Sequence, residues 1–182
     1  MPRRAATLFL FLLVLVCYSW ASEASGIWLD VPFVKQEKDG CAAASISMVM
    51  QYWSKDSNPK LFLQADPRII QQALYSEDAE GILATAMERY FQEAGFLTFV
   101  FQGDWMELDH HLSLGRPMIV CLGGSGPTRH CLVVTGLDSE HNVVLVNDPA
   151  QRKLLKMERA DFEKSWDETG KWTLLAVPTL GE

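Results

Sequence analysis

The hydrophobic positions follow a helical spacing in the first half of the chain and a strand-like spacing in the second. Apolar residues recur every three or four positions in three segments that we predict as helices, residues 41–53, 67–75 and 80–94. Runs rich in Val, Leu and Phe predict strands over residues 96–101, 117–122, 130–137, 142–148 and 171–178. Further short helices are expected over residues 104–114 and 157–167, an extended segment over 27–34, and loops over 54–66 and 123–128. This order predicts an α+β domain, with a helical half before an antiparallel sheet and a cleft between the two halves.

The N-terminus has the pattern of a secretory signal peptide. Arg3 and Arg4 precede an apolar run over residues 8–17, and small residues follow it. The run is shorter than the roughly 20 residues that a membrane span needs. We therefore expect a signal peptide over residues 1–24, a domain over residues 25–182 without a stable membrane span, and a periplasmic or extracellular location. A signal anchor, or a lipoprotein lipidated on Cys17, remains an alternative.

Composition and charge narrow the classes of function. Hydrophobic residues make up 48% and charged residues 21%, which is typical of a folded domain. The formal net charge is -7 and the pI about 5.1, and no Lys/Arg cluster stands out, so no nucleic-acid partner is expected. No Cys-x-x-Cys pair is present, and no structural zinc or other cofactor is expected.

Removal of the signal would leave three cysteines, Cys41, Cys121 and Cys131. An odd number in an exported protein leaves at least one cysteine unpaired. For Cys121 and Cys131 we favour two buried thiols in strands. A bridge between them in an oxidising compartment is the alternative.

Cys41 is the candidate nucleophile, because it falls at the first turn of the predicted helix over residues 41–53. Free backbone N–H groups and the positive end of the helix dipole favour a thiolate there. Gln36 lies shortly before it, across a polar turn. Its side-chain amide, with the backbone N–H of Cys41, could stabilise the oxyanion that forms when a thiolate attacks a carbonyl.

His130 is the candidate base, because it begins a predicted strand directly after a glycine-rich stretch. The other three histidines, His110, His111 and His141, are expected on the surface. If Leu137 faces Asn142 across the hairpin, His130 lies next to Asp148 and Pro149 at the end of the adjacent strand. Asp148 could then orient the imidazole. A slip of one residue would give this role to Asn147 instead.

Three stretches together resemble the bacteriocin-processing, double-glycine leader peptidase family of papain-like cysteine peptidases. They are VPFVKQEKDGCAAASISMVMQYW, RHCLVVTGLD and VVLVNDPA, and DFEKSW and GKWTLLAVP resemble the last helix and strand of such domains. The resemblance implies a papain-like fold, with Cys41 as nucleophile, His130 as base, Asp148 as orienting residue and Gln36 as oxyanion donor. The resemblance extends to free-standing relatives of this family, and the predicted signal peptide would make this chain an exported member. The family has glycine directly after the nucleophile, where this chain has Ala42.

These observations predict a cysteine peptidase that acts on a peptide or protein substrate without a metal or organic cofactor. A transpeptidase or amidase would use the same residues on another substrate or acceptor. A catalytically inactive, peptidase-like binding module and a disulfide-bonded structural protein are the remaining alternatives. The sequence does not predict an oligomeric state.

Overall fold

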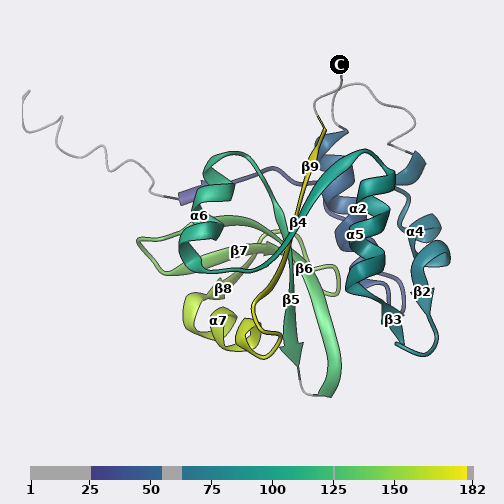
Figure 1. Ribbon diagram of the computed structural model, residues 1–182. Coiled ribbons are helices and arrows are strands. Elements are labelled where there is room, and N and C mark those ends of the chain that lie inside the picture. Colours follow the sequence, from purple (N-terminus) through teal and green to yellow (C-terminus); the bar gives the residue numbers. More distant parts are fainter. Residues whose placement is uncertain (1–25, 55–62, 125, 180–182) are drawn as a thin grey trace, which may run out of the picture.

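The computed structural model of the protein describes residues 26–54, 63–124 and 126–179 (Figure 1). The predicted signal peptide and most of the predicted loop over residues 54–66 lie outside these ranges. Within them, no helix has both the length and the apolar character that a bilayer span requires.

A seven-stranded antiparallel sheet forms the second half of the molecule, as the sequence predicts. Its strands run in the order β4-β9-β5-β6-β7-β8, and β1 pairs with β6. Their bounds are β1 Gly26–Trp28, β4 Phe96–Gln102, β5 Met118–Gly124, β6 Gly126–Asp138, β7 Val143–Asn147, β8 Leu155–Glu158 and β9 Trp172–Pro178. Along β6, β7 pairs only with residues 133–138, so no strand pairs with that edge over the preceding residues of β6.

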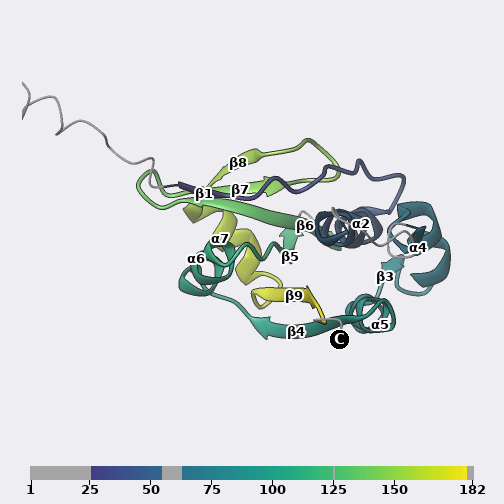
Figure 2. The same ribbon diagram turned by 90° about the horizontal axis from the view of Figure 1, so that it is seen from above.

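The helices lie in two groups on different sides of the sheet (Figures 1 and 2). The first group contains α2 (Cys41–Trp53), α4 (Pro67–Leu74) and α5 (Ala84–Glu93), and the second contains α6 (Trp105–Ser113) and α7 (Arg159–Asp167). Each group covers its own apolar cluster. The fold is therefore the predicted α+β arrangement, with a helical first half that precedes an antiparallel sheet.

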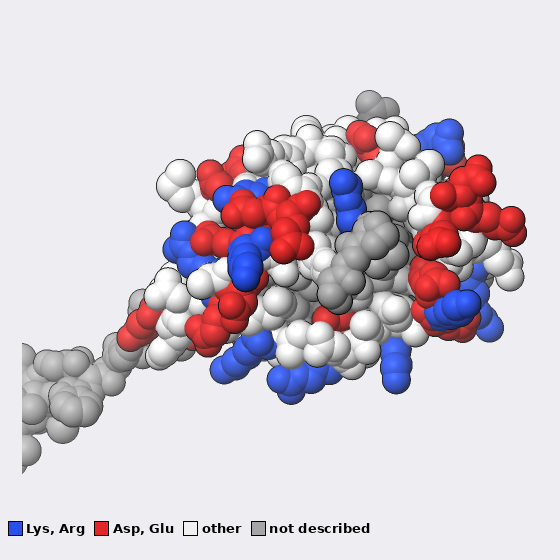
Figure 3. Space-filling model, turned by 90° about the horizontal axis from the view of Figure 1, so that it is seen from below, with Lys and Arg blue, Asp and Glu red and all other residues white. Residues whose placement is uncertain are grey.

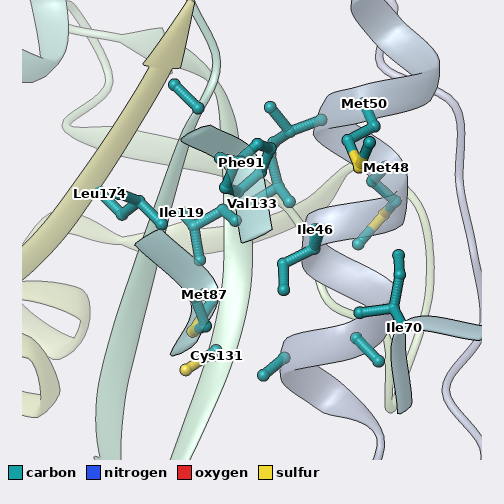
Figure 4. Packing of buried hydrophobic residues seen from close by; sticks show 14 of the residues in the cluster. Ile46, Met48, Met50, Ile70, Met87, Phe91, Ile119, Cys131, Val133 and Leu174 are labelled. Atoms are coloured by element: carbon teal, nitrogen blue, oxygen red, sulfur yellow. The ribbon is translucent and has the colours of Figure 1, made fainter. Parts of the chain in front are cut away.

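Helix α2 is the centre of the first cluster, and its bounds are those predicted from the sequence. Nine consecutive residues are buried, so the helix contacts other parts of the protein on all sides. Ile46 lies on the side of α2 that faces Phe91 of α5 and Val133 of β6, while Ile70 of α4 lies on the other side of the helix (Figure 4). Full burial of such side chains stabilises a fold by about 1.5–3 kcal/mol each. The position of the first residue of α2 is therefore fixed by the packing of the whole helix.

Two sequence predictions about local structure are wrong. The helix expected from residue 80 begins at Ala84, because Gly81–Ile82 (β3) pairs with Tyr75–Ser76 (β2) in a small hairpin. Glu80 has a φ of 46°, which a right-handed helix does not allow. In the glycine-rich stretch expected as a loop, residues 123–124 belong to β5 and residues 126–128 to β6, and His130 consequently lies inside β6 instead of at its start.

Candidate active site

Cys41 is the first residue of α2, where the helix leaves its backbone N–H groups unopposed. The preceding Gly40 provides no side-chain cap, and the first turn carries no acidic residue. The thiol is half-buried, and burial alone would raise its pKa. Hydrogen bonds from His130 and from the backbone N–H groups of Cys131 and Ala42, with the charge of His130, outweigh burial, so the pKa of Cys41 lies below the ordinary value of 9.0. The site thus favours the thiolate.

The free edge of β6 brings Cys41 and His130 together. α2 lies alongside this edge (Figure 2). The backbone N–H of Cys131 points to Cys41, and the carbonyl oxygen of Cys131 accepts a hydrogen bond of 3.2 Å from Ser45 Oγ. Ser45, one helical turn after Cys41, thereby anchors the helix start to the strand. Sequence reasoning missed both contacts, because neither residue carries a motif of its own.

His130 contacts the other two residues of the predicted triad. Its Nε2 lies 2.7 Å from Asp148 Oδ1, so the remaining ring nitrogen, Nδ1, is the one available to Cys41. The hydrogen bond to Asp148, followed by the bond to Cys41, raises the pKa of His130 to about 9 against the opposing effect of burial. The side chain of Asp148 is 4% exposed. The arrangement therefore favours the ion pair of a thiolate and an imidazolium over the neutral thiol and imidazole.

A β-bulge in β6 determines which face Asp148 occupies. The register shifts between Val134 and Gly136, and Val133 pairs with Asn147 beyond the shift. Extended by one residue, this register places Asp148 opposite Leu132, and residues directly opposite each other lie on the same face of the sheet. Leu132 is two residues after His130 and so shares its face, which puts Asp148 and His130 on one face. The expected pairing of Leu137 with Asn142 is wrong, because Leu137 pairs with Val144. Without the bulge, Asp148 would lie opposite Val133, on the other face.

Two further donors hold the Asp148 carboxylate. The backbone N–H of Ala150 donates to Oδ1 at 2.9 Å, and Gln151 Nε2 donates to Oδ2 at 2.7 Å. Burial alone would raise the pKa of Asp148, but the bonds from His130 and these donors outweigh it and lower that pKa. Gln151 was not predicted, although its position three residues after the aspartate is typical of a side chain that closes a turn.

Asn147, the alternative orienting residue, has a structural role instead. Its side chain is fully buried, and Nδ2 donates to the carbonyl oxygen of Val31 at 3.1 Å. Its Oδ1 accepts from the backbone N–H of Leu154 at 3.0 Å. Asn147 therefore fastens the extended segment before α2 to the end of β7, and its amide is not available to His130.

Gln36 lies at the end of this extended segment, in the wall of the same cleft as Cys41 and His130. Its backbone N–H donates to the carbonyl oxygen of Pro149 at 3.0 Å. Its Oε1 is buried and, within the described part of the chain, has no hydrogen-bond partner. The cleft has a volume of about 640 Å³. The structure thus brings Gln36, Cys41 and His130 to the wall of one cleft, and Asp148 contacts the cleft through its bond to His130.

Cys121 and Cys131 form a disulfide, which corrects the expectation of two buried thiols. The two residues lie directly opposite each other on β5 and β6, a pairing that the sequence alone does not reveal. Cys41 is the free cysteine of the described residues. The disulfide also lines the cleft, next to the backbone N–H that points to Cys41.

The other histidines take no part in the site. His110 and His141 are exposed, as expected, and His141 bonds to Asp138 at 2.8 Å. His111 is partly buried against Phe101 on the far side of the sheet, so the prediction of a surface position is only partly right. Across residues 26–54, 63–124 and 126–179, no group of three or more His, Cys, Asp or Glu is placed to hold a metal ion.

The model of the Peptidase_C39 like family matches residues 28–174, a range that contains all four site residues. The chain belongs to this family. Among curated proteins, none matches significantly. The family match indicates a cysteine peptidase, and the cleft contains a cysteine and a histidine that are hydrogen-bonded to each other.

Solved structures of peptidase domains share the fold. The peptidase domain of Streptococcus ComA, a bifunctional ABC transporter involved in a quorum-sensing pathway, superposes with a TM-score of 0.63 at 21% identity, covering 82% of this chain and 98% of that chain. A double-glycine-motif protease from an AMS/PCAT transporter, solved with its leader peptide, gives 0.60 at 24% identity, covering 84% and 94%. The N-terminal C39-like domain of a toxin-secretion ATP-binding protein from Vibrio parahaemolyticus gives 0.54 at 18% identity, covering 79% and 100%.

Proposed function

We propose that this protein is a cysteine peptidase that cleaves peptide bonds with Cys41 as nucleophile, His130 as acid and base, Asp148 as orienting residue and Gln36 as oxyanion donor. The observation that carries the proposal is the continuous set of hydrogen bonds from Cys41 through His130 to Asp148. Family membership and the cleft around these residues support it.

The acylation step uses the ion pair directly. The Cys41 thiolate attacks the carbonyl carbon of the scissile bond, and the carbonyl π electrons move to oxygen. Nε2–H of Gln36 and the backbone N–H of Cys41 stabilise the resulting oxyanion. As the tetrahedral intermediate collapses, the C–N bond breaks and the His130 imidazolium gives its Nδ1 proton to the leaving amine. A thioester on Cys41 and a neutral imidazole remain.

Deacylation reverses the role of His130. The neutral imidazole takes a proton from water while the water oxygen attacks the thioester carbonyl. The C–S bond then breaks, which releases a carboxylic acid and restores the thiolate and the imidazolium. Asp148 keeps the ring oriented throughout and stabilises its charged form. An amine in place of water would give transpeptidation by the same residues.

The experiment that tests the proposal measures alkylation of Cys41 by iodoacetamide across pH. In the wild type, we expect fast alkylation well below the free thiol pKa of about 8.5. We expect this fast phase to disappear in His130→Ala and to weaken in Asp148→Ala. A thiol that titrates as a free cysteine whatever occupies position 130 would contradict the triad and favour a binding module. Peptide cleavage by wild type but not by Cys41→Ala completes the test.

We also propose that the protein is exported and acts in the periplasm or outside the cell. The Cys121–Cys131 disulfide supports this location, because such bonds persist in oxidising compartments. Cell fractionation of the full chain, with the cysteine pair probed before and after reduction, tests the proposal. Reduced protein confined to the cytoplasm would contradict it.

A further inference from the structure

One wall of the catalytic cleft is strongly acidic. The turn between β2 and β3 contributes Glu77, Asp78 and Glu80 to this wall, and Asp39 adds a fourth carboxylate from the segment before α2. Arg129, which precedes His130 in β6, is a cation among the described residues that line the cleft. Figure 3 shows Asp and Glu side chains gathered over the end of the molecule that carries the β2–β3 hairpin. The charged residues that line the cleft are thus mostly acidic.

The carboxylates on the hairpin turn are not neutralised by the protein itself. Glu77, Asp78 and Glu80 are exposed. In the part of the chain that the structure describes, none of their side chains forms an ion pair or a hydrogen bond. Unpaired carboxylates at the edge of a cleft attract cations from solution, since the low-dielectric walls concentrate their field.

The turn displays these carboxylates on a fixed support. Tyr75 pairs with Ile82 and Ser76 with Gly81, and the backbone N–H of Glu80 closes the turn on the carbonyl oxygen of Glu77 at 3.2 Å. The hairpin also packs against the catalytic helix α2. The backbone that carries the acidic side chains is therefore held in place next to α2.

The cleft also has an apolar lining. It includes Ile82, Leu83, Met87, Trp172 and the Cys121–Cys131 disulfide. Leu83 is 53% exposed although it lies beside this cleft. An apolar side chain of a bound peptide would bury these surfaces, and burial of apolar area favours binding.

We propose that the cleft selects peptides in which an apolar side chain near the scissile bond is accompanied by lysine or arginine, whose charge is bound by Glu77, Asp78 and Glu80. The inference rests on the proposed peptidase function and assigns its substrate class. The cations in question belong to side chains and are not metal ions, because the described residues offer no group suited to a metal. Three solvent-exposed ion pairs together favour a ligand by about tenfold.

The first test measures binding to Cys41→Ala, which cannot turn a substrate over. Three fluorescent peptide pools share randomised Ala, Leu, Phe and Gly positions and carry either Lys, Gln or Glu at the remaining positions. We expect the Lys pool to bind about tenfold more tightly than the Gln pool at low salt, and the Glu pool to bind most weakly. This preference should decrease as salt screens exposed charges. Equal binding of the Lys and Gln pools would overturn the inference.

The matched variants separate the cleft from the overall negative charge of the protein. In Glu77→Gln/Asp78→Asn/Glu80→Gln, the Lys-to-Gln affinity ratio should fall close to one. The control Asp109→Asn/Glu158→Gln/Asp161→Asn removes the same charge from α6, β8 and α7, none of it from residues that line the cleft, and should keep the ratio. An equal loss in both variants would assign the preference to net charge and overturn the inference.

Cleavage of the same pools distinguishes failure of this inference from failure of the proposed function. Mass spectrometry of products from the wild type should show cuts close to Lys in the Lys pool. Cleavage that ignores the charged positions would overturn the inference and leave the peptidase function intact. Selective binding of the Lys pool, with no product that depends on Cys41, would contradict the peptidase function and retain the inference as one about a binding cleft.

Discussion

The backbone N–H of Gln36 donates to the carbonyl oxygen of Pro149, the residue that follows Asp148, at 3.0 Å. The proposed oxyanion donor and the residue that orients His130 are thereby connected through one peptide hydrogen bond, although more than a hundred residues of chain separate them. A displacement of the turn after β7 should consequently affect both ends of the site.

The first prediction concerns the pH range of the ion pair. The pKa of Cys41 lies below its ordinary value and that of His130 is raised to about 9. The charged pair is therefore present at pH values above the lowered pKa of Cys41, and it is lost above pH about 9 as His130 loses its proton. The bond to Asp148 is the largest cause of the raised His130 pKa. We expect Asp148→Asn to move the alkaline limb of kcat/KM to lower pH. An unchanged limb would mean that another group titrates there.

The second prediction assigns a positioning role to Gln151. Loss of its bond to Asp148 Oδ2 in Gln151→Ala should reduce kcat by about tenfold, because hydrogen bonds to charged groups contribute about 1.5–3 kcal/mol, and should shift the alkaline limb of the pH profile downward. KM should change little. Gln72→Ala, an exposed substitution on α4, is the matched control. A purely structural role for Gln151 would lower stability without moving the pH profile.

The third prediction concerns Asn147. In Asn147→Ala, the carbonyl oxygen of Val31 and the backbone N–H of Leu154 lose their partners, so we expect a loss of about 2–4 kcal/mol in the free energy of unfolding. Chemical denaturation measures it. Ser113→Ala removes an exposed hydrogen bond and should cost less than about 1 kcal/mol. Equal effects of the two substitutions would contradict the role given to Asn147.

The fourth prediction concerns the disulfide. The bond closes a short loop with a sequence separation of 10, so Cys121→Ala/Cys131→Ala should lose about 2–3 kcal/mol of stability. The activity should fall as well, since the disulfide holds in place the strand segment whose backbone N–H, that of residue 131, donates to Cys41. Thiol counting on the unfolded domain, residues 25–182, should find only the thiol of Cys41 before reduction and all three afterwards. Three thiols before reduction would exclude the disulfide.

Features that depend on residues close together in the sequence could be predicted, whereas features that depend on the pairing of distant segments could not. Residues 41–53 were predicted with their observed bounds, because helical spacing and the helix start are local properties of the sequence. The start of α5 was missed, since the pairing of Tyr75 with Ile82 competes with helix formation and contributes no local signal. The Cys121–Cys131 bond and the donors from Ser45 and Gln151 depend on register and on turns, which only the folded chain determines.

Because of the bulge between Val134 and Gly136, β6 and β7 pair in one register beside the apolar core and in another beside the candidate site. Towards the closed end of the hairpin, Leu137 and Val144 face each other within the second apolar cluster. If the strands paired regularly from there, Asp148 would point away from His130. If β6 were one residue shorter at the bulge, the hairpin could bury Leu137 and Val144 or place Asp148 beside His130, but not both. The extra residue in β6 therefore changes the register within one β-hairpin. The same two strands can then bury their apolar side chains near the turn and place Asp148 on the face of His130 at the other end.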